Sequence, residues 1–458
     1  MHALHTDLYQ LTMAAGYFHR GMADAVATCE LFVRRLPRAR HYLVAMGLER
    51  ALDYIEGLRF TDAQIEFLAT VPSLRDAMTP AFAEYLRDFR FRGGVWAMPE
   101  GTMVFAGEPI LRVRAPIIEA QILETFVLSA VNHATMIASK AARIVQTAGD
   151  AGVMEFGSRR THPEAAVDAA RAACAVGCVG TSNVEAGMRY GLPVLGTAAH
   201  MWTMAHDSED AAFEAYVAVF PSAAILLIDT YDTLRGAARA AKIAREKLKG
   251  VRLDSGDLLA LSRAVRVILD EAGCGSARIV VSGDLNEYKI AELRRAGAPI
   301  DLYGVGTELV ASVDAPALGG VYKLVELERG GRTVPIAKFS EGKATLPGPH
   351  QVHRVLGEDG RMVRDVIVLE DEPLPANARE LLVPVMDRGA RVRPAEPLAA
   401  IKARVSGELA ALPPHLHALE QGGAPYPVAP SPRLAALVEA VRAEVAAPRP
   451  GDQSAETC

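Results

Sequence analysis

The feature that most constrains this chain is an alternation of short apolar runs with Ala-rich helical segments, between about residues 119 and 325. Each run ends in Gly, Asp, Ser or Thr, and the segments between the runs repeat their apolar residues at the helical period of about 3.6. Near-continuous apolar strands that alternate with amphipathic helices predict a parallel sheet covered by helices. The runs are VMEFG, CVGTSN, PVLGT, AILLIDT, VRLDSGD, RIVVSGD and LYGVGT.

Seven such runs in one segment favour an α/β fold whose sheet curls into a (β/α) barrel, with an open doubly wound sheet as the alternative. Residues 1–118 instead mix helices with period-two strands around Gly and Pro turns, which predicts a small antiparallel unit. Beyond residue 326, Pro-rich loops replace the alternation. We therefore predict four segments: 1–118, a barrel over 119–325 that carries the active site, 326–445, and a disordered tail over 446–458.

Composition and charge exclude several classes of protein. The chain has 458 residues and a formal net charge of −6 with acids and bases interspersed, which argues against nucleic-acid binding. The N-terminus lacks the basic start of a signal peptide, and the longest apolar run, residues 215–228, is too short to span a membrane and contains Pro221. Five scattered cysteines have no zinc-site spacing and are typical of reduced thiols. We expect a cytoplasmic protein without a membrane segment.

The polar residues that end the apolar runs are the candidate functional residues, because barrel active sites lie at the carboxyl ends of the strands. Two late runs end in SGD and GVGT, which place Ser282 with Gly283 and Gly306 with Thr307 at turns before helices. Small residues there let backbone N–H groups approach a phosphate. The alternative is that these glycines only tighten the turns.

A charged pair and an arginine pair stand at two other strand ends. In VRLDSGD, Arg252 and Asp254 point to the same side of a strand because side chains alternate. Such a pair is costly in a barrel interior unless the two groups bind each other or a ligand, so a purely structural ion pair is the alternative. Arg159 and Arg160 follow VMEFG, where guanidinium groups suit bidentate binding of anionic oxygens.

His200 is the candidate catalytic histidine, since it follows the run that ends in Gly196 and Thr197. We expect Asp207 or Glu209 to fix the tautomer of its ring. The alternative is a histidine that is merely hydrogen-bonded within a loop.

These strand ends resemble those of the nicotinate phosphoribosyltransferases, a family of type II phosphoribosyltransferases. The resemblance covers roughly residues 6 to 325 in the same order, and the C-terminal third matches loosely. The family usually has Ser-Asn-Asp where this chain has Ser282-Gly283-Asp284, and the stretch HMWTMAHDSED is also atypical. The matching stretches are TDLYQLTMAAGYF, EFGSRR, GTSNVEAGMRYGLPVLGTAAH, GVRLDSGDL, YGVGTELV and LGGVYKLV.

The resemblance implies an irregular (β/α) barrel joined to an α/β domain built from both chain ends, with 326–445 packing against the N-terminal part. It implies a homodimer with shared active sites. It also implies an enzyme, of the ligase and glycosyltransferase type, that couples nicotinate and phosphoribosyl diphosphate to nicotinate mononucleotide and pyrophosphate. ATP is then a co-substrate, Mg²⁺ a cofactor, and the pathway NAD salvage.

The family's residue roles carry over by position. His200 matches the histidine that ATP phosphorylates, and Asp254 would help to complete the phosphate and ribose site. Because a carboxylate can stabilise a developing ribosyl cation, we assign Asp254 a catalytic role on the ribose or metal side. The resemblance implies nicotinate contacts by Tyr9, Thr197 and Arg252. It implies phosphoribosyl diphosphate contacts by Arg159, Arg160, Ser282, Gly283, Gly306 and Thr307. The resemblance assigns no metal ligands.

Three other functions compete with this one. A nicotinamide phosphoribosyltransferase would share the architecture, although TDLYQLTM and GTSNVEAG favour nicotinate. A sugar-phosphate lyase or isomerase would need a Schiff-base lysine or paired carboxylates at a strand end, and neither is evident there. A catalytically silent homologue is disfavoured because His200, Arg252, Asp254 and Thr307 are all present.

Overall fold

The chain folds into two compact units in a computed structural model that describes residues 3–420 and 422–447. The terminal unit comprises the chain up to Thr135, Leu318–Pro397 and the chain from Arg404 onward. The central unit comprises Met136–Ala317 and Leu398–Ala403. The central unit is therefore shorter at both ends, by up to about twenty residues, than the barrel that we predict over 119–325. Our four-segment division stays a prediction. Most of the predicted tail, 448–458, lies outside the described residues.

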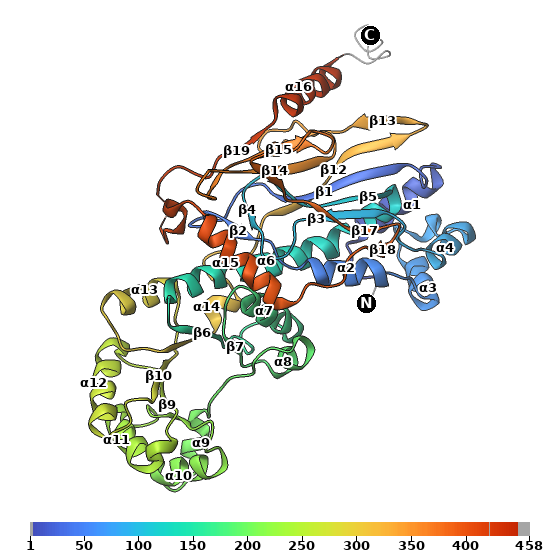
Figure 1. Ribbon diagram of the computed structural model, residues 1–458. Coiled ribbons are helices and arrows are strands. Elements are labelled where there is room, and N and C mark those ends of the chain that lie inside the picture. The colour runs from blue at the N-terminus through green and yellow to red at the C-terminus, as the bar shows by residue number, and fades with distance from the viewer. Residues whose placement is uncertain (1–2, 421, 448–458) are drawn as a thin grey trace, which may run out of the picture. The chain divides into compact units, whose positions relative to one another are not determined.

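The terminal unit is built on a seven-stranded antiparallel sheet in the order β13-β12-β1-β5-β3-β17-β18. A four-stranded sheet, β16-β14-β15-β19, and the pair β2-β4 complete its strands (Figure 1). Its strands are β1 (Val26–Val33), β2 (Leu43–Val44), β3 (Gly94–Ala97), β4 (Met103–Val104), β5 (Pro109–Pro116), β12 (Gly320–Arg329), β13 (Arg332–Pro335), β14 (His350–Leu356), β15 (Met362–Leu369), β16 (Ala378–Glu380), β17 (Val383–Asp387), β18 (Ala390–Arg391) and β19 (Val428–Pro430).

Helices α1 to α5 bury apolar faces in one core with the seven-stranded sheet, whereas α16 packs in a separate cluster against β15. Thr61 caps α3, and the Gln64 side chain completes the capping box. The predicted antiparallel pairing is confirmed by β3 and β5. The helices are α1 (Leu8–His19), α2 (Leu48–Gly57), α3 (Asp62–Thr70), α4 (Pro80–Arg87), α5 (Ile117–Ile122) and α16 (Pro432–Ala446); α6 (Glu124–Ala148) and α15 (Leu398–Ala411) have residues in both units.

The central unit contains a six-stranded parallel sheet in the order β7-β6-β11-β10-β9-β8, with helices between the strands (Figure 1). The strands are β6 (Gly152–Glu155), β7 (Gly180–Thr181), β8 (Ile225–Leu227), β9 (Gly250–Leu253), β10 (Arg278–Val281) and β11 (Leu302–Val305). The helices are α7 (Pro163–Ala175), α8 (Val184–Tyr190), α9 (His200–Met204), α10 (Glu209–Val219), α11 (Thr233–Ala244), α12 (Leu258–Glu271), α13 (Glu287–Arg295) and α14 (Thr307–Val310).

The predicted fold class is confirmed, and the sheet curls into a half-barrel rather than a closed ring. Six of the seven apolar runs form β6–β11. The remaining run, around Val194, makes a single parallel bridge to Thr181 and does not reach β8. Pro193 has no N–H to donate to a ladder, and glycines at 191 and 196 flank this short run, so it cannot extend into a full strand.

Small side chains let the helices approach the sheet closely. Helix α7 buries eight residues, six of them alanines, and α11 buries Gly236 with four alanines. Figure 1 shows α11 and α12 along the outer side of β9 and β10. A Cβ at Gly236 would lie 2.2 Å from the Ile228 carbonyl oxygen, so only glycine allows α11 to lie this close to β8.

A buried ion cluster ties α6 to the segment around α13 and α14. The Nζ of Lys140, which is 1% exposed, lies 2.6 Å from Glu287 Oε2 and 2.9 Å from Asp314 Oδ1. Arg143 Nε donates to the other oxygen of Glu287 at 3.2 Å. A buried carboxylate that loses one of its cations is strongly destabilising, so this cluster helps to hold β10 and β11 through the helices that follow them.

In the described part of the chain, no helix combines the length and the apolar character that a membrane crossing requires.

Replacing Lys140 by Met should lower stability by about 3 kcal/mol, because two carboxylates lose a buried cation while the side-chain volume stays similar. Urea unfolding followed by circular dichroism measures the loss as a lower midpoint. Glu185→Gln is the control, since its pair with Arg189 is solvent-exposed and should contribute little. Equal midpoints for the two variants would contradict the structural role of the buried cluster.

Candidate active site

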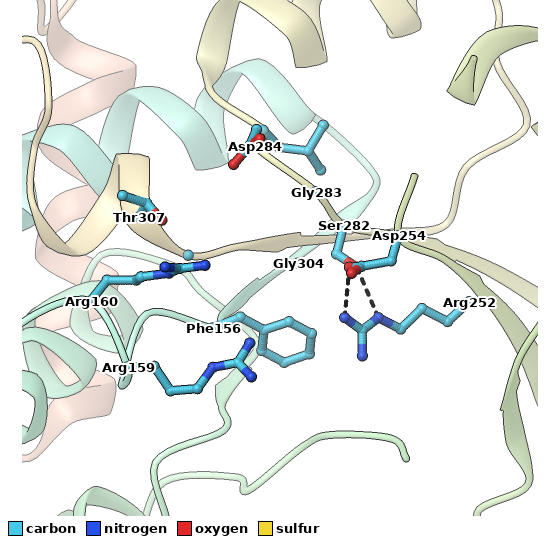
Figure 2. A pocket seen from close by; sticks show the side chains of 12 residues that line it. Phe156, Arg159, Arg160, Arg252, Asp254, Ser282, Gly283, Asp284, Gly304 and Thr307 are labelled. Atoms are coloured by element: carbon cyan, nitrogen blue, oxygen red, sulfur yellow. Dashed lines mark hydrogen bonds and ion pairs between the residues drawn. The ribbon is translucent and has the colours of Figure 1, made fainter. Parts of the chain in front are cut away.

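The carboxyl ends of β6, β9, β10 and β11 surround a cavity of about 250 Å³, here called the Thr307 cavity (Figure 2). It unites turns that lie more than one hundred residues apart in the sequence. Parallel strands bring their carboxyl ends to the same edge, which is why these turns meet. The lining residues are Phe156, Arg159, Arg160, Arg252, Asp254, Ser282, Gly283, Asp284, Leu285, Gly304, Gly306 and Thr307.

A second cavity of about 370 Å³, here called the His200 cavity, adjoins the first. The two cavities share four lining residues: Phe156, Arg159, Arg252 and Asp254. The His200 cavity is further lined by Ser158, Ser182, Gly196, Thr197, Ala198, Ala199, His200 and Leu227. The structure therefore gathers every predicted site residue of the central unit around one continuous group of side chains.

Arg252 connects the two cavities. Its Nε donates to Ser282 Oγ at 2.8 Å, its Nη1 to Thr197 Oγ1 at 3.1 Å, and its Nη2 to Asp254 Oδ1 at 2.7 Å. The guanidinium carbon lies 5.6 Å from the centroid of the Phe156 ring. Because a guanidinium has five N–H groups, two remain to bind a ligand. Arg252 is thus held by three side chains and still has N–H groups available for a ligand.

Asp254 is held as a carboxylate by its neighbours. Burial by itself would raise the pKa of Asp254, but the Ser282 hydroxyl and the Arg252 guanidinium outweigh burial and lower the pKa below its usual range. Asp229 supports the same turn, since its Oδ2 accepts hydrogen bonds from the Asp254 backbone N–H and the Ser255 hydroxyl, both at 2.8 Å. The carboxylate of Asp254 therefore carries its negative charge at neutral pH.

Arg159 and Arg160 bring positive charge that no carboxylate in the described part of the chain neutralises through an ion pair. Both side chains are exposed, and in the view of Figure 2 the Phe156 ring lies between the Arg159 and Arg252 side chains. Unpaired guanidinium groups at the wall of a cavity suit an anionic ligand with several oxygens.

Gly283 is required by the shape of its turn. Its φ is +96°, and a Cβ there would lie 2.2 Å from the Asp254 carbonyl oxygen. Asp284 follows with a φ of +46°. The asparagine that the family resemblance leads one to expect does not fit this backbone, so the turn can present backbone N–H groups but no amide side chain at this position.

The structure corrects the expected partners of His200. Its Nδ1 lies 3.1 Å from Thr230 Oγ1, and its Nε2 lies 3.9 Å from Asp254 Oδ2. Glu209 instead accepts a hydrogen bond from Arg239 Nη1 at 2.9 Å. The expectation that Asp207 or Glu209 orients the ring is wrong, because the carboxylate that faces His200 is Asp254, in the turn after β9.

Asp257 and the predicted site residue Tyr9 line neither cavity. Asp257, in the same motif as Asp254, caps α12 by accepting the Ala260 N–H. Tyr9 is an exposed residue of α1 in the terminal unit, whereas all lining residues of the two cavities belong to the central unit. Sequence reasoning missed Phe156 and Thr230. The only signal for Phe156 was an aromatic residue directly at a strand end.

Two carboxylates could hold a divalent cation in the Thr307 cavity. Asp254 and Asp284 both line it, and Asp284 makes no ion pair within the described residues. Over those residues, no group of three or more His, Cys, Asp and Glu side chains is placed to bind a metal. Mg²⁺ is usually held by one or two carboxylates together with substrate phosphates, so the residues present fit Mg²⁺ brought in with a phosphorylated ligand.

Two family models match the chain. The model described as the nicotinate phosphoribosyltransferase N-terminal domain matches residues 4–132. The model described as the nicotinate phosphoribosyltransferase family matches residues 151–344, which include every lining residue of the two cavities.

Similar proteins are known over nearly the whole length of the chain. Nicotinate phosphoribosyltransferase pncB2 of Mycobacterium tuberculosis is 43% identical over 457 residues, which cover 98% of this chain and 96% of the relative. The nicotinate phosphoribosyltransferase of Bacillus subtilis is 44% identical and covers 81% of this chain and 76% of the relative. The crystal structure of human nicotinic acid phosphoribosyltransferase superposes with a TM-score of 0.85 at 32% identity, covering 95% of this chain and 99% of that one.

Ser282→Ala should raise the pKa of Asp254 toward its ordinary value of about 3.9, because the carboxylate loses a hydroxyl donor. The carboxylate stabilises the fold above that ordinary value, and this contribution is lost as the pH falls through the lowered pKa. In the variant, the stabilisation by the Asp254 carboxylate begins to be lost at a higher pH than in the wild type. An NMR titration of the Asp254 carboxyl carbon measures the shift, with Asp254→Asn to assign the signal. An unchanged midpoint would show that Arg252 alone sets the pKa.

Proposed function

The chain belongs to the nicotinate phosphoribosyltransferase family, and from that premise we propose that it transfers phosphoribose from phosphoribosyl diphosphate to nicotinate. The products are nicotinate mononucleotide and pyrophosphate, within NAD biosynthesis. The observation that supports this most is the placement of Arg252 and Asp254 between two adjoining cavities, one with unpaired arginines and Gly-rich turns and the other with His200. One cavity suits a diphosphorylated sugar, and the border between them suits a small aromatic acid.

The chemistry requires no general base. The pyridine nitrogen of nicotinate carries a free lone pair, so it is already a nucleophile. The costly species is the positively charged ribosyl group that develops as pyrophosphate departs. Catalysis then depends on positioning and electrostatics, with cations at the leaving group and a carboxylate near the ribose. We assign Asp254 to the ribose, because its lowered pKa keeps the carboxylate charged.

We assign nicotinate to the border between the cavities. The two remaining N–H groups of Arg252 would bind the carboxylate of nicotinate in a charge-assisted contact of about 1.5–3 kcal/mol. Thr197 already bonds Arg252 and would keep that group oriented. The Phe156 ring offers an apolar face against which a pyridine ring can stack.

We assign the diphosphate to the Thr307 cavity. Arg159 and Arg160 supply charge there, and the turns at Gly283, Gly306 and Thr307 bring backbone groups to the same wall. The Ser282 hydroxyl is occupied by Arg252 and Asp254, so we assign it to holding those two groups rather than to the phosphate. Asp254 and Asp284 would hold Mg²⁺, which when bound neutralises part of the charge on the departing pyrophosphate.

We further propose that ATP hydrolysis is coupled to the transfer through phosphorylation of His200. The ring is 40% exposed and lines the cavity that also contains Arg159 and Arg252. A phosphate there adds about two negative charges, which can order the nearby cationic side chains around the substrate. We also propose a cytoplasmic homodimer with shared sites, in which Tyr9 is the candidate residue that reaches the partner's site.

Release of pyrophosphate from nicotinate and phosphoribosyl diphosphate, with and without ATP, tests the activity directly. Nicotinamide in place of nicotinate tests the alternative substrate, because an amide lacks the charge that Arg252 would bind. Faster turnover of nicotinamide than of nicotinate would overturn the proposal.

His200→Ala should abolish the stimulation by ATP but leave slow, ATP-independent transfer, because the diphosphate and nicotinate contacts remain. Initial rates with and without ATP measure the effect. His206→Ala is the control, since the ring of His206 bonds the Trp202 carbonyl and lines neither cavity. Full stimulation of the His200 variant by ATP would contradict the phosphohistidine.

Arg252→Ala should raise the KM for nicotinate by about ten- to one-hundred-fold, the equivalent of a lost charge-assisted contact. The KM for phosphoribosyl diphosphate should change much less. Arg252→Lys is the matched variant, because it keeps the charge but loses the forked geometry. Its KM for nicotinate should lie between those of the wild type and of Arg252→Ala. Steady-state kinetics with each substrate varied in turn provide the measurement, and equal effects on both KM values would count against the carboxylate contact.

A further inference from the structure

Glu155 is a buried acid that the proposed reaction does not use. It ends β6 and is 0% exposed. Its Oε1 accepts the backbone N–H of Gly157, and its Oε2 accepts the hydroxyl of Thr181 at 2.5 Å. Thr181, also 0% exposed, ends the neighbouring strand β7. A single side chain therefore joins the loops that follow two adjacent strands.

The hydrogen-bond directions favour an ionised carboxylate. The Asn183 N–H donates to Thr181 Oγ1 at 3.0 Å, and the Thr181 hydroxyl in turn donates to Glu155 Oε2. The Gly157 N–H can only donate. Both oxygens of Glu155 therefore act as acceptors, as those of an ionised carboxylate do.

A buried charge at this position is costly. In the described residues, both bonding partners of Glu155 are neutral donors, and burial raises the pKa of Glu155 although the Thr181 hydroxyl and the Gly157 amide lower it. Packing alone would be served at lower cost by an apolar side chain. The bonds that Glu155 makes therefore point to a task in the following loop.

That loop is the turn from Gly157 to Arg160. The Arg160 N–H bonds the Gly157 carbonyl at 2.8 Å, which closes the turn. Asn183 Nδ2 donates to Ser158 Oγ at 3.2 Å from the β7 side. A Cβ on Gly157 would lie 2.2 Å from Val310 Cγ1, so the first residue of the turn packs closely against α14. Glu155 holds this residue by its N–H, and Arg159 and Arg160 follow directly.

We propose that Glu155 is a positioning residue that orients the Arg159–Arg160 turn for the diphosphate of the substrate. This assignment rests on the proposed function, since that function makes the two arginines phosphate ligands. Glu155 touches no substrate. It acts through the Gly157 N–H on one side and Thr181 on the other, and so aligns two long, flexible cations before the substrate arrives.

Glu155→Gln tests the proposal, because it keeps the shape but removes the negative charge, so that the Gly157 N–H meets a neutral acceptor and the Thr181 hydroxyl must turn to accept from the amide. The KM for phosphoribosyl diphosphate should rise about tenfold, which corresponds to replacing hydrogen bonds to a charged group by neutral ones. The KM for nicotinate should stay within about twofold, since Arg252 is held by other residues. Thr181→Val removes only the hydroxyl and should give a smaller rise in the same KM.

A double-mutant cycle separates positioning from general stability. With both Arg159 and Arg160 replaced by Ala, the further change Glu155→Gln should leave the KM for phosphoribosyl diphosphate unchanged, because the groups that it orients are gone. Glu209→Gln is the control, as Glu209 is also buried but pairs with Arg239 outside the cavities, and its KM values should equal those of the wild type. Additive effects in the cycle, or equal rises in both KM values, would overturn the proposal.

Binding of inorganic pyrophosphate, measured by calorimetry, provides a readout without turnover. Glu155→Gln should bind it about tenfold more weakly than the wild type. The two proposals can fail separately. If the wild type forms no nicotinate mononucleotide but Glu155→Gln still binds pyrophosphate more weakly than the wild type, the proposed function fails and the positioning role stands. If Glu155→Gln does not fold, Thr181→Val decides: unchanged pyrophosphate affinity in that variant would refute the role of the Glu155–Thr181 link.

Discussion

The contact on which the site depends most is the three-way binding of Arg252. One guanidinium reaches side chains from three different turns, at Thr197, Asp254 and Ser282. A parallel sheet brings the carboxyl ends of its strands to one edge but leaves the turns there separately mobile. Because Arg252 is planar and has donors in a fixed fork, it can hold these turns in register and still present two N–H groups to a ligand.

Carboxylates at strand ends provide the complementary support. Asp229 binds the turn after β9, and Glu155 binds the turns after β6 and β7. The oxygens of these acids accept hydrogen bonds from neutral N–H and hydroxyl groups. Arg159 and Arg160 therefore have no ion pair among the described residues. A protein with a net charge of −6 can therefore present a locally cationic cavity.

Periodicity was sufficient to predict the parallel sheet, because near-continuous apolar runs bounded by turn residues rarely form anything else when helices separate them. It also placed Arg252, Asp254, His200 and Thr307 at one edge, where the two cavities now contain them. It failed at closure of the ring, since pairing of the Val194 run depends on strand length and on the missing N–H of Pro193. It also could not separate Asp254, which lines the cavity, from Asp257 in the same motif, whose oxygen caps a helix.

The sequence by itself determined which residues end the strands, and therefore which chemical groups are available at the functional edge of the half-barrel. Only the tertiary structure decided the partners of those groups: Thr230 and Asp254 for His200, Ser282 for Arg252, and a turn at Gly283 that excludes any side chain. The physical reason is range. Alternation and capping are local and repeat along the chain, whereas a hydrogen bond between two strand ends depends on how each strand is staggered and tilted beside its neighbour.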